Sequence, residues 1–586
     1  MLQIFKHIGK RNFGLFILSI FLIYGQVWFE LKLPDYMSKI TMVIQQNKGS
    51  IEPVLQAGGR MLLCALGSLA MAVCVTFISA RIASDFSASL RSRIFRRVQE
   101  YSMAEISRFS TASLVTRATN DVMQVQFLIV MGMNSIVRAP IMAGVSFMKI
   151  RGKSWQWSAA TGIAIAALLG VLGILILLTM PKFKIIQSLT DDLNRVTREN
   201  LSGLKVIRAY QAENYQREKF EQVNSRLTAT HLFTGRSMAF LMPVIMAIMN
   251  ALTLSIYWIG ALLINKAGLL NKMTIFSEMI VFIAYAMQMV MAFMMLVAIF
   301  IFFPRASVAA GRILEVLNTK SSIVDGERTD ASEGLKGDIE FKDVSFRYPD
   351  GENDAIEHIS FHAKPGSTVA LIGSTGCGKS TVINLIPRFF DVTGGAVLVD
   401  GVDVREYRQS VLRDRIGYIS QNAVLFSGSI SSNIAYGAVN EKKPEEEAIR
   451  RAAETAQAEE FIEQMDGTYN AIVSRGGSNL SGGQRQRVSI ARALARDPEI
   501  LIFDDSFSAL DFKTDRQLRD ALKQNYSDKT ILIVAQRIST IKDADLILVL
   551  DKGKIAGSGT HAELLETCPV YRQIALSQLS EEELKR

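Results

Sequence analysis

Long apolar runs separated by charged segments fill the chain up to about residue 303, and shorter apolar runs follow. A membrane helix needs about 20 predominantly apolar residues. Six runs reach that length, at 13–33, 57–80, 126–148, 156–180, 237–264 and 274–303. The pattern therefore predicts a multidomain chain with an all-α transmembrane domain of six helices at 1–312, a connector at 313–337 and a soluble α/β domain at 338–586.

Two long polar segments, 81–125 and 181–236, separate the second span from the third and the fourth from the fifth. Both are rich in Arg, Gln, Glu and Leu and lack clusters of turn residues, which favours helix. Either the membrane helices continue into the cytoplasm and turn at short helices near 109–116 and 209–215, or the segments are two ordinary cytoplasmic loops.

Basic residues crowd between the apolar runs. The stretch after the second span holds Arg81, Arg91, Arg93, Arg96, Arg97, Arg108 and Arg117. Cytoplasmic loops of membrane proteins carry such an excess of Lys and Arg. The net charge of +9 is therefore explained without a nucleic-acid partner. The four cysteines have no metal-ligand spacing, so a zinc site is not supported.

The same charges predict the orientation of the chain. With Lys6, Lys10 and Arg11 inside, six spans return the chain to the cytoplasm, where the soluble domain is expected. The loop between the third and fourth spans, with Lys149, Arg151 and Lys153, favours the opposite orientation, but the long basic segments outweigh it.

Two polar residues interrupt the first span. Gln26 and Glu30 are expensive in lipid and are candidates to line a wet surface. Glu30 also lies close to the outer end of the span, where it can reach the interface. Neither residue identifies a substrate.

The clearest chemistry lies at GSTGCGKST, which follows the apolar strand VALIG and precedes the helix TVINLIPRFF. Its residues are Gly373, Ser374, Thr375, Gly376, Cys377, Gly378, Lys379, Ser380 and Thr381. This is a P-loop: glycines let backbone N–H groups surround phosphates, Lys379 reaches the β- and γ-phosphates, and Ser380 ligates Mg²⁺. A helix N-terminus at the anion adds to the attraction. The motif predicts ATP and Mg²⁺ as cofactors.

A second apolar strand, EILIFDD, ends in acids. A buried strand ending in Asp is common by itself and becomes specific only beside a P-loop. In that company Asp504 is expected to help hold Mg²⁺.

The segment NLSGGQRQR is the motif that points to a known family. Ser481, Gly482, Gly483 and Gln484 open a helix and form a second phosphate grip. With this motif the whole chain resembles the ABC transporters, and within them a type IV (B-family) exporter half. The resemblance also favours long helical extensions over ordinary loops. It implies that the signature contacts ATP held by the opposite subunit.

The resemblance assigns roles to three further residues. Tyr348 of FRYP would stack on adenine, although alone it would be taken for an ordinary strand aromatic. Gln421 of YISQ would sense Mg²⁺ and the γ-phosphate and link to the membrane domain. Asp511 of SALD would form the D-loop across the dimer.

Two positions depart from the family pattern, and both concern hydrolysis. Asp505 replaces the usual Glu that activates water, and its carboxylate is one methylene shorter. Gln536 replaces the switch His; it can hydrogen-bond the γ-phosphate but cannot carry a positive charge. Either these are tolerated variants of a slow homodimer, or the chain resembles the degenerate-site half of heterodimeric bacterial multidrug ABC exporters.

The second reading implies ATP-driven export of hydrophobic or amphipathic, drug-like compounds across the cell membrane of a bacterium. The chain would contribute a degenerate ATP site and lend its intact signature to the competent site of a second half-transporter. Its other contacts would be the lipid bilayer and the small-molecule substrate. The alternatives are a lipid or peptide exporter half, a slow homodimeric exporter, or an ATP-binding regulatory subunit that transports nothing.

Overall fold

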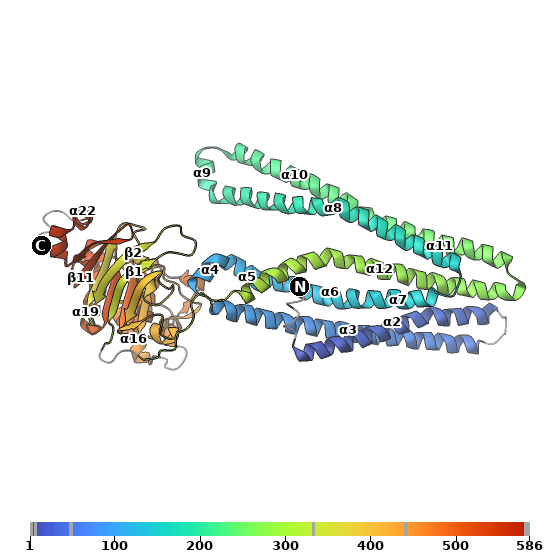
Figure 1. The fold of residues 1–586 in the computed structure, drawn as a ribbon, viewed down its shortest axis with the longest axis horizontal. Coiled ribbons are helices and arrows are strands. Elements are labelled where there is room, and N and C mark those ends of the chain that lie inside the picture. The colour runs from blue at the N-terminus through green and yellow to red at the C-terminus, as the bar shows by residue number, and fades with distance from the viewer. Residues whose placement is uncertain (1–3, 5–8, 46–50, 331–334, 439–443, 579–586) are drawn as a thin grey trace. The chain divides into compact units, whose positions relative to one another are not determined.

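The computed structural model describes residues 4, 9–45, 51–330, 335–438 and 444–578. Its N-terminal part consists mainly of helices, most of them long (Figure 1). They are α2 (Lys10–Gln45), α3 (Glu52–Gln99), α5 (Thr111–Thr116), α6 (Val122–Gly132), α7 (Arg138–Ile150), α8 (Trp155–Ser202), α10 (Glu213–Ala239), α11 (Leu241–Lys266) and α12 (Leu269–Asn318), with π-helical turns η1 (Arg117–Asp121) and η2 (Met133–Val137) on either side of α6.

Among the described residues, six helical stretches are long and apolar enough to cross a membrane. They are Lys10–Ile44, Glu52–Gln99, Thr111–Ile150, Trp155–Ser202, Glu213–Lys266 and Asn271–Leu296. Each overlaps one predicted span, so the prediction of six membrane helices is confirmed. The chain is a multi-pass membrane protein.

Two helices are far longer than a membrane requires. α3 and α8 each have 48 residues, which is about 72 Å at the rise of an α-helix. The hydrocarbon core of a bilayer is about 30 Å thick. Both helices therefore continue beyond the apolar layer, and the alternative of two ordinary loops is wrong.

Each extension leads to a short helix that begins earlier than predicted. These helices are α4 (Met103–Phe109) and α9 (Leu204–Ala209). The predictions of turns near 109–116 and 209–215 are therefore wrong by about one helical turn or more. α4 starts early because the Ser102 hydroxyl caps it while the Ser102 N–H donates to Glu105. This Ser-x-x-Glu capping box is visible in the sequence and would have placed α4.

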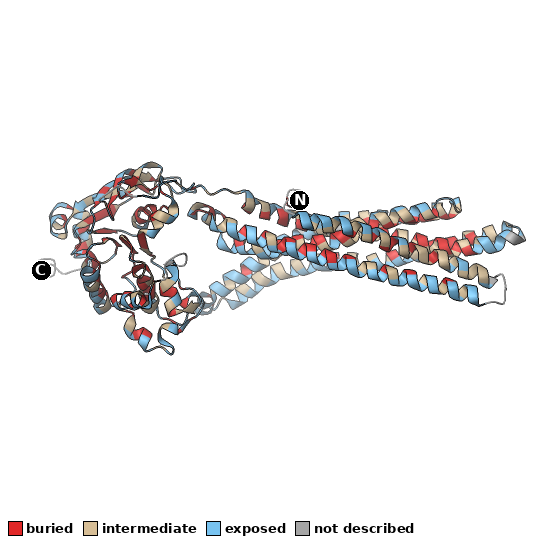
Figure 2. Ribbon diagram, turned by 90° about the horizontal axis from the view of Figure 1, so that it is seen from below, coloured by how far each residue is buried: buried red, intermediate tan, exposed pale blue. Residues whose placement is uncertain are grey.

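The buried faces of the membrane helices are narrow (Figure 2). In the apolar window of α3, 17% of the residues are buried. Leu62, Leu66 and Leu69 each leave more than half of their surface exposed. Such a continuous apolar exterior suits contact with lipid rather than water.

Glu30 is ion-paired inside the helix bundle. The Arg138 Nη2 atom, on α7, lies 2.8 Å from both Glu30 carboxylate oxygens. Gln26 donates to Glu30 Oε1 at 3.1 Å, and the Ser68 hydroxyl on α3 donates to it at 3.2 Å. The carboxylate therefore ties together α2, α3 and α7, which accounts for a charge at this depth without a lining role.

Replacing Glu30 by Gln is expected to destabilise the bundle, because it leaves the Arg138 guanidinium without its carboxylate. Both side chains are about one-fifth exposed, so the expected loss is about 2 kcal/mol, less than for a fully buried pair. Thermal unfolding of the full-length protein in detergent measures it. Glu278→Gln, which removes the longer and more exposed pair with Lys153, is the matched control. An unfolding temperature for Glu30→Gln no lower than for this control would contradict the expectation.

Two of the three basic residues in the loop between the third and fourth spans are ion-paired. Lys149 Nζ lies 2.7 Å from an Asp35 oxygen, and Lys153 Nζ lies 3.4 Å from a Glu278 oxygen. Two of the cations that argued against the predicted orientation thus have acidic partners within the bundle. Acidic partners count little in the positive-inside rule, so the predicted orientation still rests on the long basic segments.

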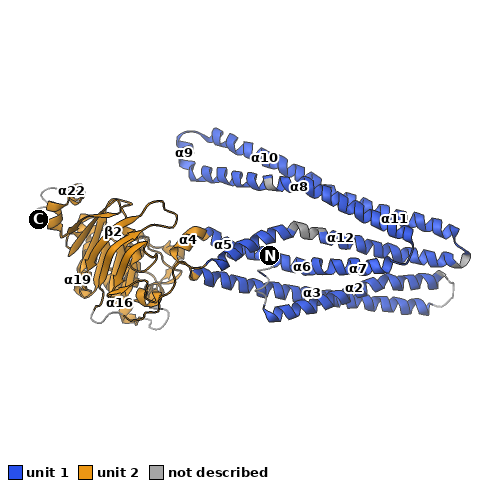
Figure 3. Cartoon of the chain, in the orientation of Figure 1, with its two compact units in different colours: residues 1–98, 112–319 blue, residues 99–111, 320–586 orange. Residues whose placement is uncertain are grey.

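The chain divides into two compact units, 1–98 with 112–319 and 99–111 with 320–586 (Figure 3). The second unit includes α4, because the Ser322 N–H donates to Glu105 Oε1 at 3.1 Å and the Ser102 and Ser322 hydroxyls lie 3.0 Å apart. α12 ends at Asn318, so the helix covers 313–318 of the predicted connector. Residues 331–334 of that connector, and Lys6, lie outside the described residues.

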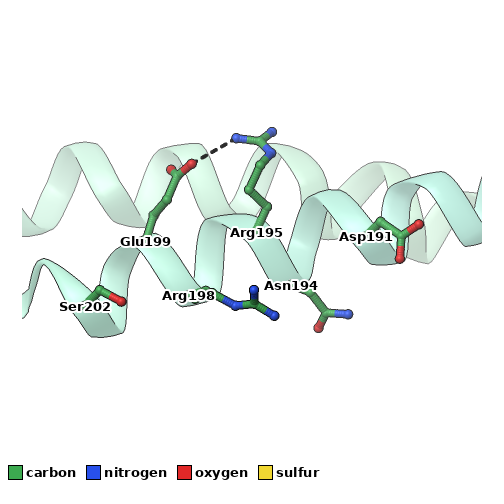
Figure 4. Close-up of a pocket in the computed structure, with 6 residues that line it drawn as sticks. All are labelled: Asp191, Asn194, Arg195, Arg198, Glu199 and Ser202. Carbon is green, nitrogen blue, oxygen red and sulfur yellow. Dashed lines mark hydrogen bonds and ion pairs between the residues drawn. The ribbon is translucent and has the colours of Figure 1, made fainter. Parts of the chain in front are cut away.

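A hairpin of α8 and α10 extends from the first unit and is held by ion pairs. Arg195 and Lys219 both contact Glu199, at 3.2 and 2.8 Å. A hollow beside α8 is lined by Asp191, Asn194, Arg195, Arg198, Glu199 and Ser202 (Figure 4). All six side chains come from one helix, so the hollow is a polar helix surface rather than a cavity enclosed by several elements.

The second unit carries the predicted α/β domain, and its fold class is confirmed. An antiparallel sheet has the order β2 (Ile356–Ala363), β1 (Ile339–Phe346), β4 (Gly394–Val399), β5 (Val402–Asp403). A six-stranded sheet has the order β12 (Lys554–Gly559), β11 (Leu546–Asp551), β3 (Thr368–Gly373), β10 (Thr530–Val534), β9 (Ile500–Asp504), β6 (Ile416–Ile419). A small sheet pairs β7 (Gly428–Ser429) with β8 (Ile472–Val473).

Helices surround these sheets. They are α13 (Lys379–Leu385), α14 (Gln409–Asp414), α15 (Ile430–Ile434), α16 (Glu446–Thr455), α17 (Glu459–Glu463), α18 (Gly482–Leu494), α19 (Phe512–Asn525), α20 (Ile538–Ile541), α21 (His561–Thr567) and α22 (Pro569–Leu576). Short 3₁₀ turns are η3 (Ala435–Ala438), η4 (Thr468–Asn470) and η5 (Arg475–Gly477).

The six-stranded sheet separates two apolar clusters. Successive residues of β10, 531–534, alternate between them, as the two faces of a strand require. β3, β10 and β9 are parallel neighbours. Their last residues, Gly373, Val534 and Asp504, therefore lie at one edge, where parallel sheets place their ligands.

Candidate active site

The P-loop lies between β3 and α13, at that edge of the sheet. Gly373, Gly376 and Gly378 have φ angles of 153°, 82° and 102°, values that favour glycine. A Cβ on Gly373 would collide with the carbonyl oxygen of Leu550. The glycines thus allow a tight curl whose N–H groups can surround a phosphate.

Lys379 lies across this loop. Its Nζ donates to the carbonyl oxygens of Gly373 and Ser374, both at 2.8 Å, and contacts Cys377 Sγ at 3.6 Å. Thr375 belongs to the same loop, and Thr381 lies in the first turn of α13. From this position a lysine can turn toward β- and γ-phosphates.

The predicted metal-binding oxygens of Ser380 and Asp504 are neighbours. Ser380 Oγ donates to Asp504 Oδ1 at 2.8 Å, and the Tyr418 hydroxyl donates to Oδ2 at 3.3 Å. Burial raises the pKa of Asp504, and the hydrogen bonds from Ser380 and Tyr418 oppose the rise. A hydroxyl beside a carboxylate is a donor set that suits Mg²⁺.

Asp505 is the centre of a second polar cluster. Gln421 Nε2 and Gln536 Nε2 donate to the same carboxylate oxygen, Oδ2, at 3.1 and 2.7 Å. The side chain is 7% exposed. Burial raises the pKa of Asp505, hydrogen bonds from Gln421 and Gln536 oppose the rise, and the nearby Asp504 adds to it. The structure thus brings all three predicted residues together, with Gln421 directed at Asp505 rather than at the oxygens of Ser380 and Asp504.

Tyr348 lies beside the P-loop rather than in a strand, since β1 ends at Phe346. Its hydroxyl is 3.0 Å from Thr381 Oγ1, and its ring packs edge-on against Phe346 and Phe390. The ring is 37% exposed. Part of an aromatic surface is therefore open next to the phosphate loop, as adenine stacking requires.

The signature residues form a separate group at the start of α18. Ser481 is the N-cap: its hydroxyl accepts the Gln484 N–H at 3.2 Å, and its own N–H donates to Gln484 Oε1 at 2.9 Å. Ser481 and Gly482 are exposed. A Cβ on Gly483 would lie 3.3 Å from the Ala509 carbonyl oxygen, which places α18 against the segment after β9. The helix start is pre-formed and open to an anion.

Asp511 caps the neighbouring helix, α19. Its carboxylate accepts the Thr514 N–H at 2.9 Å and the Thr514 hydroxyl at 2.8 Å. Hydrogen bonds from Thr514 lower the pKa of Asp511. The residue is exposed beside the signature helix, where a partner domain can contact it.

Comparison with known proteins identifies the family. The ABC transporter family matches residues 356–508, and the ABC transporter transmembrane region matches 16–293. An uncharacterized ABC transporter ATP-binding protein of Mycobacterium tuberculosis is 39% identical over 541 residues, 91% of this chain and 90% of the relative. The chain belongs to the ABC transporter family.

Two further relatives of this ABC transporter extend the comparison. An ATP-dependent lipid A-core flippase of Pectobacterium atrosepticum is 33% identical and covers 89% of the chain and 88% of the flippase. The solved structure of a bacterial Atm1-family ABC exporter with ATP bound has a TM-score of 0.79 at 24% identity, covering 98% of this chain and 99% of that chain. The structural similarity to the Atm1-family exporter establishes the exporter fold.

The chain is one half of an ABC exporter. It carries one transmembrane region and one ATP-binding domain, and ABC exporters act in the membrane as dimers. The family is one of ATP-hydrolysing transporters, so the P-loop of this ABC transporter binds ATP.

Two residues of the site lie outside the residues that the sequence motifs assign. Tyr418 is on β6, adjacent to β9, three residues before Gln421. The residues YIS directly before the predicted Gln were a signal for it. Gln578 donates to the Gln536 carbonyl oxygen at 2.7 Å. It lies 42 residues away in sequence, and no local pattern indicates the contact.

Proposed function

We propose that this chain is the degenerate-site half of a heterodimeric exporter that moves hydrophobic or amphipathic, drug-like compounds across the cell membrane of a bacterium. The observation that carries the proposal is the engagement of Asp505 Oδ2 by both Gln421 and Gln536. The signature residues, in contrast, retain a complete capping box.

The chain's own site is suited to hold ATP more than to hydrolyse it. Lys379 and the loop amides hold the phosphates, Tyr348 supports adenine, and Ser380 and Asp504 hold Mg²⁺ with Gln421 as a sensor. A general base must reach the attacking water. Asp505 is one methylene short of the usual Glu, both amide donors already occupy one of its oxygens, and Gln536 cannot accept or carry the proton that a His can.

The signature serves the other site. Ser481 to Gln484 contact the γ-phosphate of ATP held by the partner, and Asp511 contacts the partner across the dimer. That partner supplies Glu and His at the two altered positions. Hydrolysis in its site resets the pump, while ATP in this chain's site keeps the motor domains together. A non-transporting regulatory subunit would not need the intact signature.

A second cargo, lipid, is favoured by one observation. Relatives about one-third identical over most of the chain are named lipid A-core flippases. A fluorescent cationic dye and a fluorescent phospholipid, each offered to proteoliposomes containing the complex, separate the two cargoes. ATP-dependent movement of the phospholipid alone would replace the drug-like cargo with lipid.

ATP hydrolysis by the full-length chain purified alone is expected to be slow. Addition of a partner half with Glu and His at the two positions should raise it by about 10²-fold, because a base misplaced by about 1 Å loses that much. Phosphate release in lipid nanodiscs measures both rates. Lys379→Ala is the control for contaminating ATPases. Fast turnover by the isolated chain, sensitive to Lys379→Ala, would contradict the heterodimer and leave the homodimeric exporter.

A further inference from the structure

The switch loop after β10 is held by a different contact at each of three consecutive residues. Gln536 donates to Asp505 at 2.7 Å. The Arg537 guanidinium lies 4.8 Å from the ring centroid of Phe512, the first residue of α19. The Ile538 side chain is fully buried. The loop thus touches the carboxylate after β9, the start of α19 and the core at once.

The side chain of Gln578 forms two hydrogen bonds with the backbone of this loop. Gln578 Nε2 donates to the Gln536 carbonyl oxygen at 2.7 Å, and the Ile538 N–H donates to Gln578 Oε1 at 2.8 Å. One carboxamide therefore uses both its donor and its acceptor on the two peptide groups that bracket Arg537. Glutamine is a side chain that can do this, since it carries an N–H donor and a carbonyl acceptor on one plane.

Gln578 is anchored to a helix that packs into the core. It follows α22, and its N–H donates to the Ala575 carbonyl oxygen at 3.1 Å. Tyr571 and Ala575 of that helix are fully buried. The contact therefore connects the switch loop to a helix fixed in the core, although the Gln578 side chain itself is exposed.

We propose that Gln578 is a positioning residue of the ATP site: it holds the switch-loop backbone so that Gln536 lies at the phosphate end of the site. The inference rests on the proposed function in one respect, that Gln536 contacts the γ-phosphate. A loop ordered beforehand loses less entropy when ATP binds. ADP lacks the γ-phosphate, so its binding does not depend on the position of Gln536.

Equilibrium binding of radiolabelled Mg-ATP and Mg-ADP to the full-length protein tests this role. Gln578→Ala should weaken ATP binding about fivefold, the loss of about one net hydrogen bond, and leave ADP binding unchanged. Gln578→Glu keeps the acceptor for Ile538 but loses the donor to Gln536, so it should also weaken ATP selectively. Gln573→Ala, an exposed glutamine of α22, is the matched control and should change neither affinity.

A double-mutant cycle separates positioning from general stability. If Gln578 acts through Gln536, Gln578→Ala should have no further effect on ATP binding in a Gln536→Ala background. Equal loss of ATP and ADP affinity, or full additivity in the cycle, would overturn the proposal. Fast ATP hydrolysis by the isolated chain would instead overturn the proposed degenerate site. It would not alter the effect of the Gln578 variants on the ratio of ATP affinity to ADP affinity, so failure of the proposed function and failure of the positioning role are distinguishable.

Discussion

Replacing Asp505 by Glu and Gln536 by His together is expected to speed hydrolysis of ATP bound at this chain's site by about 10²-fold, the usual effect of placing a general base correctly. The added methylene moves the carboxylate toward the γ-phosphate. The backbone cannot make up this distance in the native site, because the Asp505 N–H is bonded to the Val534 carbonyl oxygen at 3.0 Å and the residue has φ 48°.

Replacing Gln536 by His restores the second residue that the family pattern uses for hydrolysis. Gln536 donates one hydrogen bond to Asp505 Oδ2 and has no proton to exchange. His at this position can be charged or neutral near neutral pH. It can therefore stabilise charge that develops on the phosphate, which an amide does less well. The two single replacements should each recover only part of the rate.

Single-turnover hydrolysis of pre-bound radiolabelled ATP in the full complex measures the change. The slowly hydrolysed fraction of the ATP is assigned to this chain's site. Its lifetime should shorten in the double variant. Asp520→Glu, the same chemical change on the exposed surface of α19, is the matched control. If the double variant retains bound ATP for as long as the native protein and hydrolyses it at the same rate, Asp505 and Gln536 do not limit hydrolysis.

The parts of the site predictable from sequence are those that local chemistry determines. The P-loop needs glycines at fixed spacing because the backbone takes left-handed φ angles there, and Asp504 ends an apolar strand next to it. Such patterns lie within a few residues, so a motif records them. The six spans are predictable for the same reason, since each is one predominantly apolar run of sufficient length.

The contacts that escaped prediction join distant parts of the chain. Arg138 is 108 residues from Glu30, and Gln578 is 42 residues from Gln536. Hydrophobic period and composition do not specify which polar side chains meet after folding. The early start of α4 is different, because its capping box, from Ser102 to Glu105, is local and readable in the sequence.

Gly482→Asp is expected to abolish transport by the complex, with a loss on the order of 10² or more, as when an oxyanion site loses its donors. In the proposed heterodimer, a carboxylate at the start of α18 would lie where the partner's γ-phosphate binds and would repel it. The fold should tolerate the change, because a Cβ on Gly482 meets no atom within 4 Å. An acidic residue in the first turn also suits the helix dipole.

Gly482→Ala is the matched control, since it adds the same Cβ without the charge and should retain most activity. ATP binding to this chain's own P-loop should be unchanged in both variants, because the proposal assigns α18 to the partner's site. Lys379→Ala should have the reciprocal effect: it empties this chain's site and lowers transport less than Gly482→Asp does. The unequal result follows only if the two sites differ. In a homodimer each chain supplies both elements to equivalent sites, so the two variants would be equally inactive.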